Sequence, residues 1–213
     1  LMLGTALSSM LSGDLYVEGR SPLKDKLNDA IAAPKLSVID NGQIPESHRT
    51  CAIDMEGVKV NPTTLIAEGI FKTYLYNRKY GTAAEFETTG NASRGSNLPY
   101  ESRLGIAPHK LVIQPGTKNL SEILANYDKA VYIEAIPTGL HTMNMFNGDF
   151  SLTSNNCFLI ENGSISTPLD NLNLSGNFFK FLKEIDHIGA DSTSGHGVAN
   201  SPTIVVNNMT FSS

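Results

Sequence analysis

The sequence contains few cysteines, and their positions restrict the kinds of site it can hold. It has only two, Cys51 and Cys157, which lie far apart, in no CxxC pair and with no histidine beside either. A disulfide framework and a local zinc knuckle both need cysteines at short, regular spacings. The sequence therefore excludes both and predicts a protein of a reducing compartment, the cytoplasm.

Basic clusters and long hydrophobic runs are also absent. The formal net charge is -5, and no stretch collects lysine or arginine, which excludes the clustered positive charge that a nucleic-acid surface requires. The longest uncharged stretch, residues 1–13, is shorter than the roughly 20 residues that span a bilayer and lacks the basic start of a signal peptide. We expect neither a nucleic acid nor a membrane as a partner.

The sequence does contain enough apolar residues for one core. Hydrophobic residues make up 40% of the 213 positions and charged residues 17%, which excludes a mainly disordered chain and favours one domain over residues 1–213. The chain opens in the middle of an apolar pattern at helical spacing, and this predicts a first helix and an upstream part that is missing. The pattern consists of Leu3, Leu7, Met10 and Leu11.

The first half predicts a second helix, several strands and a long loop. Ser21 is a favourable N-cap before Pro22, so a helix is expected over residues 21–31. Short β-rich runs follow at 35–39, 64–67 and 70–76, and a tight turn between the last two predicts a hairpin. Residues 87–109 mix Gly, Asn, Ser, Pro and Arg irregularly, which predicts a long loop of the kind that is usually functional or mobile.

The second half predicts a mostly antiparallel arrangement. Asn119 and Glu122 form a capping box for a helix between strands at 110–114 and 130–136. Asn-Gly pairs at 147–148 and 162–163 predict the hairpins of a meander, and a helix from Asn177 and a strand over 203–211 follow. The predicted fold class is α+β, a β-dominated curved antiparallel sheet or partly closed barrel with a few covering helices.

Several segments, in one order over nearly the whole chain, resemble the C-terminal domain of the TldD/PmbA family. The first is SSMLSGDLYVEGRSPLKDKLNDAIAAPKLSVID, which is similar to the family's helix, small-residue turn, Gly-Arg-Ser and strand. The central ones are EGVKV, TLIAEGIFKTYLYNRKYG and TTGNASR, and the last is NGDFSLTSNNCFLIENGSISTPLDNLNLSGN, which resembles its double hairpin. The resemblance implies that the chain is the C-terminal half of such a protein.

This resemblance implies a zinc peptidase system in the cytosol of bacteria or archaea. In the family, one subunit type binds zinc through an HExxxH helix of its N-terminal half and a cysteine near its C-terminus, and the partner type lacks these ligands. The family's known roles are trimming of leader peptides from modified peptides and degradation of small unfolded proteins.

The chain most resembles the PmbA/TldE-type subunit. It contains neither HExxH nor HExxxH, and its segment ADSTSGHGVANSPTIVV has Ser194 near the position of the metal-binding cysteine. A hydroxyl is a much poorer zinc ligand than a thiolate. The resemblance therefore implies that this chain binds no metal or other cofactor, and that zinc belongs to the partner or, alternatively, to an upstream HExxxH. The implied partners are a homologous TldD-type subunit or a second copy, and an extended peptide.

Seven residues are candidates for contact with that peptide. In the predicted loop, a Gly-Asn pair followed by arginine can present backbone amides and one fixed charge to a peptide carbonyl or carboxylate. His141 and His196 flank segments that approach the catalytic region in the zinc-bearing relatives, and Ser194 lies near the position of the family's metal-binding cysteine. A loop-shaping or surface role is the alternative for each. The candidates are Thr89, Gly90, Asn91, Arg94, His141, Ser194 and His196.

No catalytic residue is predicted in this chain. Asp191, Ser194 and His196 are too close in sequence for the geometry of a serine-hydrolase triad, and Cys157 lies in an apolar strand, where a free thiol packs as a small hydrophobe. His187, also in a predicted strand, is assigned a structural role. Three functions stay open: an assisting subunit, an active metallopeptidase with its motif upstream, and a peptide-binding or regulatory β-scaffold without proteolysis.

Overall fold

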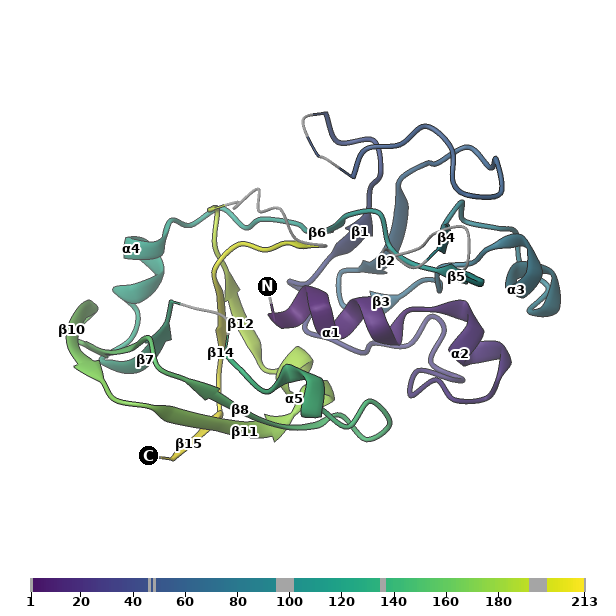
Figure 1. The fold of residues 1–213 in the computed structure, drawn as a ribbon. Coiled ribbons are helices and arrows are strands. Elements are labelled where there is room, and N and C mark those ends of the chain that lie inside the picture. Colours follow the sequence, from purple (N-terminus) through teal and green to yellow (C-terminus); the bar gives the residue numbers. More distant parts are fainter. Residues whose placement is uncertain are drawn as a thin grey trace.

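The structure is a computed structural model that describes residues 2–45, 47, 49–94, 102–134, 137–191 and 199–212. Strands dominate it and form several small sheets, with short helices between and against them (Figure 1). Within these residues, none of the sheets closes on itself. The predicted β-dominated α+β class is confirmed.

A five-stranded sheet organises the first part of the chain. It contains β1 (Val38–Asp40), β2 (Thr63–Ala67), β3 (Ile70–Phe71), β6 (Leu111–Ile113) and β13 (Ala199–Asn200), in the order β13-β6-β1-β2-β3. The pairs are antiparallel, except that β13 runs parallel to β6. The predicted first helix is α1 (Met2–Met10), which packs its apolar face on β6 and β13, and the short α2 (Gly13–Val17) follows it.

Residues 21–31 form turns, so the helix predicted there is wrong. Asp25 and Asn28 have φ angles of 63° and 66°, which a right-handed helix does not allow. Ser21 caps only a local turn, through the amide of Leu23. The segment instead pairs with the neighbouring hairpin, since the Asn28 amide donates to the Phe71 carbonyl at 2.8 Å. Tertiary hydrogen bonds override the local helix signal.

The predicted hairpin of β2 and β3 is confirmed. Glu68 and Gly69 form its turn at φ angles of 48° and 79°. Glycine is required at the second position, because a Cβ there would lie 2.4 Å from the carbonyl oxygen of Ala32. The strand ends at Phe71, however, and does not continue to residue 76 as predicted.

Residues 87–109 are more regular than the predicted long loop. They follow α3 (Arg78–Ala83), whose first turn is capped by the side chain of Asn77. Within them, β4 (Ala92–Arg94) pairs antiparallel with β5 (Leu104–Ile106). The prediction of an irregular loop is therefore wrong for these two segments, and residues 95–101 between them lie outside the described residues.

In the described residues of the second part of the chain there are three small antiparallel sheets and two α-helices. The first sheet contains β10 (Ser164–Leu169), β9 (Cys157–Glu161) and β7 (Lys129–Ile133), and the second contains β15 (Thr210–Ser212), β11 (Leu172–Asn177) and β8 (Asp149–Ser154), each in the order given. The third pairs β12 (Ile185–Ile188) with β14 (Ile204–Val206). The helices are α4 (Leu120–Leu124) and α5 (Phe178–Lys183), with the 3-10 turn η1 (Leu140–Thr142) before β8.

The predicted starts of α4 and α5 are confirmed. Asn119 accepts from the Glu122 amide while the Glu122 carboxylate accepts from the Asn119 amide, which is the predicted capping box of α4. Asn177 caps α5, whose Phe178, Phe181 and Leu182 are buried.

The antiparallel meander is only partly as predicted. Asn162 and Gly163 join β9 to β10 with φ angles of 49° and 76°, as the sequence predicted. The other Asn-Gly pair precedes β8 and joins no two strands. The single strand predicted at 203–211 is wrong, because a residue with positive φ, Asn208, separates β14 from β15, which belong to different sheets.

One buried apolar cluster extends through both parts of the chain. Figure 1 shows α1 between the five-stranded sheet and the sheets of the second part, and its residues are buried with side chains from both. Cys157 is 1% exposed and belongs to β9, as predicted. The most enclosed members from the two parts include Leu7, Leu36, Leu65, Phe71, Leu111, Leu152 and Phe178.

Candidate functional site

A groove with a cavity volume of about 630 Å³ opens between α4, β7 and the segment from β14 to β15. Figure 1 shows β7 and β14 in neighbouring sheets. Many of the apolar side chains that line the groove are only partly buried, so they offer contact area to a further chain. They include Leu120, Leu124, Val131, Ile133, Ile204, Val206, Met209 and Phe211.

Among the residues that the structure describes, one side of the groove is a strand with a free edge. Among the described strands, β7 pairs only with β9. Two backbone hydrogen bonds set the ladder: the Asn162 amide donates to the Asp128 carbonyl, and the Glu134 amide donates to the Asn156 carbonyl. The backbone N–H and C=O groups of the even-numbered residues in this segment therefore point toward β9. By the alternation of an antiparallel ladder, the backbone groups of Val131 and Ile133 face the other way. This edge can pair with an added strand of about five residues.

A carboxylate holds Tyr127, one of the residues that line the groove, by a hydrogen bond. The Tyr127 hydroxyl donates to Oδ2 of Asp186 at 2.7 Å, and the Lys35 ammonium lies 3.2 Å from Oδ1. The Tyr127 hydrogen bond and the Lys35 contact lower the pKa of Asp186 to about 2, against the effect of burial. The ring of Tyr127 also packs edge-on against His187 in β12, in line with the structural role predicted for that histidine.

Removing the Tyr127 hydroxyl is expected to weaken the fold in a pH-dependent way. Because the folded-state pKa of Asp186 is depressed, its stabilising effect is present above about pH 4 and is lost as the pH falls toward 2. We expect Tyr127→Phe to lower the free energy of unfolding by about 1 kcal/mol at pH 7, and by less at pH 3.

Urea unfolding at the two pH values measures this difference. Tyr132→Phe is the matched control, since Tyr132 lines the same groove and its hydroxyl makes no hydrogen bond to a described residue. An equal loss in both variants, or a loss that does not change with pH, would contradict the role given to Asp186.

The predicted residues of the 89–91 segment hold the loop together. The buried Asn91 donates from Nδ2 to Oδ2 of Asp40 at 2.6 Å and to the Ala107 carbonyl at 3.1 Å. The Thr89 hydroxyl donates to Oδ1 of Asn91. Gly90 has a φ of 73°, and its carbonyl accepts a hydrogen bond from Nε2 of His109. These contacts support the loop-shaping alternative, and contact of these residues with a peptide stays a prediction.

The other candidates are spread over the molecule. Arg94 is exposed in β4 and donates to the Ser102 carbonyl. His141 is exposed in η1, in the other part of the chain, and no hydrogen bond or ion pair among the described residues joins it to the 89–91 segment. Ser194 and His196 lie outside the described residues. In the chain they fall between Asp191 and Ser201, which both line the groove.

No local sequence pattern predicts one pair of reactive side chains, because its members are 58 positions apart. Sγ of Cys51 lies 3.3 Å from Nδ1 of His109. The Gly90 carbonyl at Nε2 fixes the tautomer in which Nδ1 accepts from the thiol. Burial, with Asp40 and Asp54 nearby, raises the pKa of Cys51, so the thiol stays protonated.

This pair does not fit a zinc site, which needs at least three protein ligands. Over the residues that the structure describes, no three His, Cys, Asp or Glu side chains gather to hold a metal ion.

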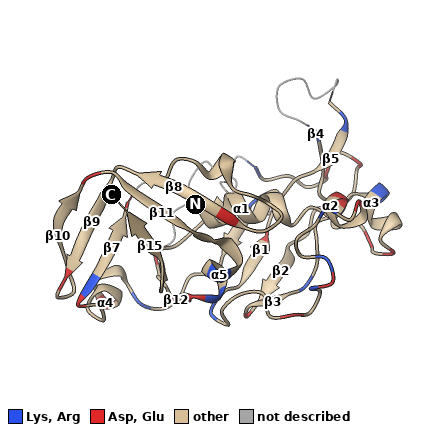
Figure 2. Ribbon diagram, turned by 90° about the horizontal axis from the view of Figure 1, so that it is seen from below, with Lys and Arg blue, Asp and Glu red and all other residues tan. Residues whose placement is uncertain are grey.

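The described residues include no helix long and apolar enough to cross a membrane. Figure 2 shows the described charged residues of both signs interspersed over the ribbon.

Comparison with known proteins gives a consistent set of relatives. The family model described as the PmbA/TldA metallopeptidase C-terminal domain matches residues 1–213. A metalloprotease of Methanocaldococcus jannaschii is 28% identical over 187 residues, which cover 87% of this chain and 40% of that protein.

Two crystal structures have the same fold. A proposed modulator of a DNA gyrase from Thermotoga maritima MSB8 superposes with a TM-score of 0.88 at 29% identity, over 99% of this chain and 46% of the other. TldE from Thermococcus kodakarensis shares the fold with a TM-score of 0.86 at 24% identity, over 99% and 48%. The chain thus spans less than half of the length of these relatives.

Proposed function

Because the chain belongs to the family of PmbA/TldA metallopeptidase C-terminal domains, we propose that it is part of a PmbA/TldE-type subunit of a zinc peptidase system. In this proposal the chain receives an extended peptide and supplies no zinc ligand. A homologous TldD-type subunit, or a second copy, completes the peptidase. The products are trimmed leader peptides or fragments of small unfolded proteins.

The free edge of β7 beside the groove is the observation that carries the proposal. An extended peptide can add to an open sheet edge through main-chain hydrogen bonds, which do not depend on its sequence. The outward backbone groups of Val131 and Ile133 provide the hydrogen bonds, and the apolar lining of the groove provides contact for alternate side chains. Such a surface suits unfolded polypeptides of varied sequence.

The assignment to the assisting subunit rests on the residues available for metal binding. The sequence has no HExxxH, and it has Ser194 near the position of the family's cysteine ligand. Cys51 and Cys157 are both free, and the first is paired with a single histidine. Free thiols also favour a reducing compartment, and we place the system in the cytoplasm.

Hydrogen exchange tests where the peptide binds. The full-length protein is mixed with its homologous partner and an unfolded casein fragment, and amide exchange is followed by mass spectrometry. We expect slower exchange at the outward amides of β7. The outer strand β10 is the internal control, because it forms the opposite edge of the same sheet and lines no part of the groove. Protection of β10 alone, or of neither strand with the fragment bound, would exclude the β7 edge.

A further inference from the structure

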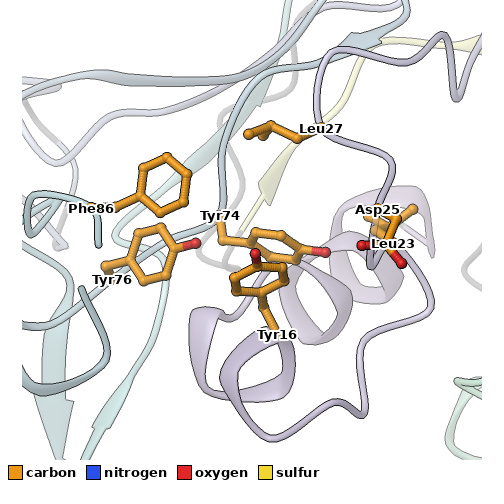
Figure 3. A pocket seen from close by; sticks show the side chains of 7 residues that line it. All are labelled: Tyr16, Leu23, Asp25, Leu27, Tyr74, Tyr76 and Phe86. Atoms are coloured by element: carbon orange, nitrogen blue, oxygen red, sulfur yellow. The ribbon is translucent and has the colours of Figure 1, made fainter. Parts of the chain in front are cut away.

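A second cavity, of about 210 Å³, lies between α2, the turns that follow it and the segment after β3. Figure 3 shows the seven side chains that line it. It shares no lining residue with the groove, and Figure 1 shows α2 far from β7. Its walls are aromatic and aliphatic, with one carboxylate. The lining residues are Tyr16, Leu23, Asp25, Leu27, Tyr74, Tyr76 and Phe86.

Four aromatic rings form the walls of this cavity. Tyr16 stacks on Tyr74 with centroids 5.1 Å apart, and Tyr76 stacks on Phe86 with centroids 5.6 Å apart. The backbone leaves room for this arrangement only because residue 13 is glycine, since a Cβ there would lie 2.3 Å from the Tyr76 ring. The rings are therefore held in place by the fold, and their π-faces suit a cation.

The hydroxyl of a largely buried tyrosine lies at the cavity. Tyr76 is 1% exposed, and Figure 3 shows its hydroxyl directed toward Tyr74 and Tyr16. Among the described residues nothing hydrogen-bonds to it, whereas the Tyr74 hydroxyl has Ser21 Oγ at 2.8 Å. Burial raises the pKa of Tyr76, so the group stays a neutral phenol. Because the hydroxyl lines an open cavity, a ligand that enters can hydrogen-bond to it.

A carboxylate lies at the mouth of the cavity. Asp25 is exposed, and no ion pair or hydrogen bond from a described residue occupies its side chain. The nearby Lys26 pairs instead with Asp29, at 3.6 Å. Asp25 is close enough to Tyr74 to contribute to the raised pKa of that phenol, which burial brings to about 12. The mouth is thus acidic and the interior is aromatic.

We propose that this pocket binds a primary alkylammonium group, such as the side chain of a lysine. The aromatic faces attract a cation, Asp25 supplies the opposite charge, and the Tyr76 oxygen accepts one ammonium hydrogen. The volume is below the roughly 300 Å³ at which pockets for drug-sized molecules begin, and it suits a single side chain. This site goes beyond the proposed peptidase function and does not depend on it.

Binding of small probes to the full-length protein tests the proposal. Nα-acetyl-lysine methylamide is titrated by calorimetry against Nα-acetyl-norleucine methylamide, which lacks the ammonium group. We expect the lysine compound to bind about tenfold more tightly or better. Asp25→Asn is expected to remove most of that preference, and Tyr76→Phe to reduce it. At its φ of 63°, Asp25 accepts asparagine without strain.

The matched control is Asp29→Asn, an exposed carboxylate of the same segment that lines neither this pocket nor the groove. It should leave binding unchanged, and thermal unfolding confirms that each variant is folded. Equal binding of the two probes, binding of neither the probes nor butylammonium, or an Asp25→Asn variant that binds like the parent would overturn the proposal. Butylammonium distinguishes a lysine side chain from a free amine as the ligand. If butylammonium binds tightly and the lysine compound does not bind, the ligand is a free small amine, which still supports a site for an alkylammonium group.

Discussion

Replacing Asn91 with alanine is expected to lower the free energy of unfolding by about 3 kcal/mol. Asn91 and Asp40 are 1% and 2% exposed, and the amide of Asn91 donates to Oδ2 of Asp40 at 2.6 Å. The other carboxylate oxygen accepts from the Lys110 amide. Without Asn91, a buried carboxylate oxygen loses its hydrogen bond, and uncompensated buried charge costs several times more than an ordinary lost contact. Urea unfolding at pH 7 measures the loss.

A second substitution separates this effect from the loss of packing. Asp40→Asn in the Asn91→Ala background removes the uncompensated charge, so we expect part of the lost stability to return. If Asn91→Ala costs less than about 1 kcal/mol, or if the second substitution only adds to the damage, the carboxylate does not depend on Asn91.

Substitution of Val131 by proline is expected to weaken binding of an unfolded peptide about tenfold or more. The Val131 amide points away from β9, so proline removes a hydrogen-bond donor from the free edge and leaves the ladder with β9 intact. Main-chain hydrogen bonds supply most of the affinity in strand addition, so the loss should be large. Fluorescence anisotropy of a labelled casein fragment, with the mixed complex, measures it.

The matched control for this variant is Val131→Thr. Threonine has a similar shape and keeps the backbone amide, so it should bind the fragment within about threefold of the parent, because only the side chain changes. If the Val131→Pro variant binds the fragment as well as the Val131→Thr variant does, and both variants remain folded, the peptide does not pair with β7.

Local signals predicted the elements whose ends are fixed by their own side chains. The capping box of Asn119 and Glu122, the cap at Asn177 and the turn at Glu68-Gly69 all appear where the sequence predicts them. The helix expected at 21–31 has equally good local signals. It does not form, because the segment hydrogen-bonds to the β2–β3 hairpin, and no pattern within the segment shows that contact.

The site was less predictable than the fold because it depends on the assembled sheets. The strand at β7 was predicted, but its position at an open edge follows from the sheet order and not from its residues. Cys51 and His109 meet across 58 positions. Tyr74 and Tyr76 are two residues apart, which is a signal for a shared face, but Tyr16 and Phe86 complete the pocket from distant segments.

The zinc content of the purified full-length protein, alone and after co-expression with its homologous partner, tests the central claim most directly. Casein cleavage is followed in the same samples. We expect no stoichiometric zinc and no cleavage for the protein alone, and both in the mixed complex. Stoichiometric zinc and cleavage by the protein alone would contradict it, and would identify an active peptidase whose metal ligands lie outside the residues described in this structure.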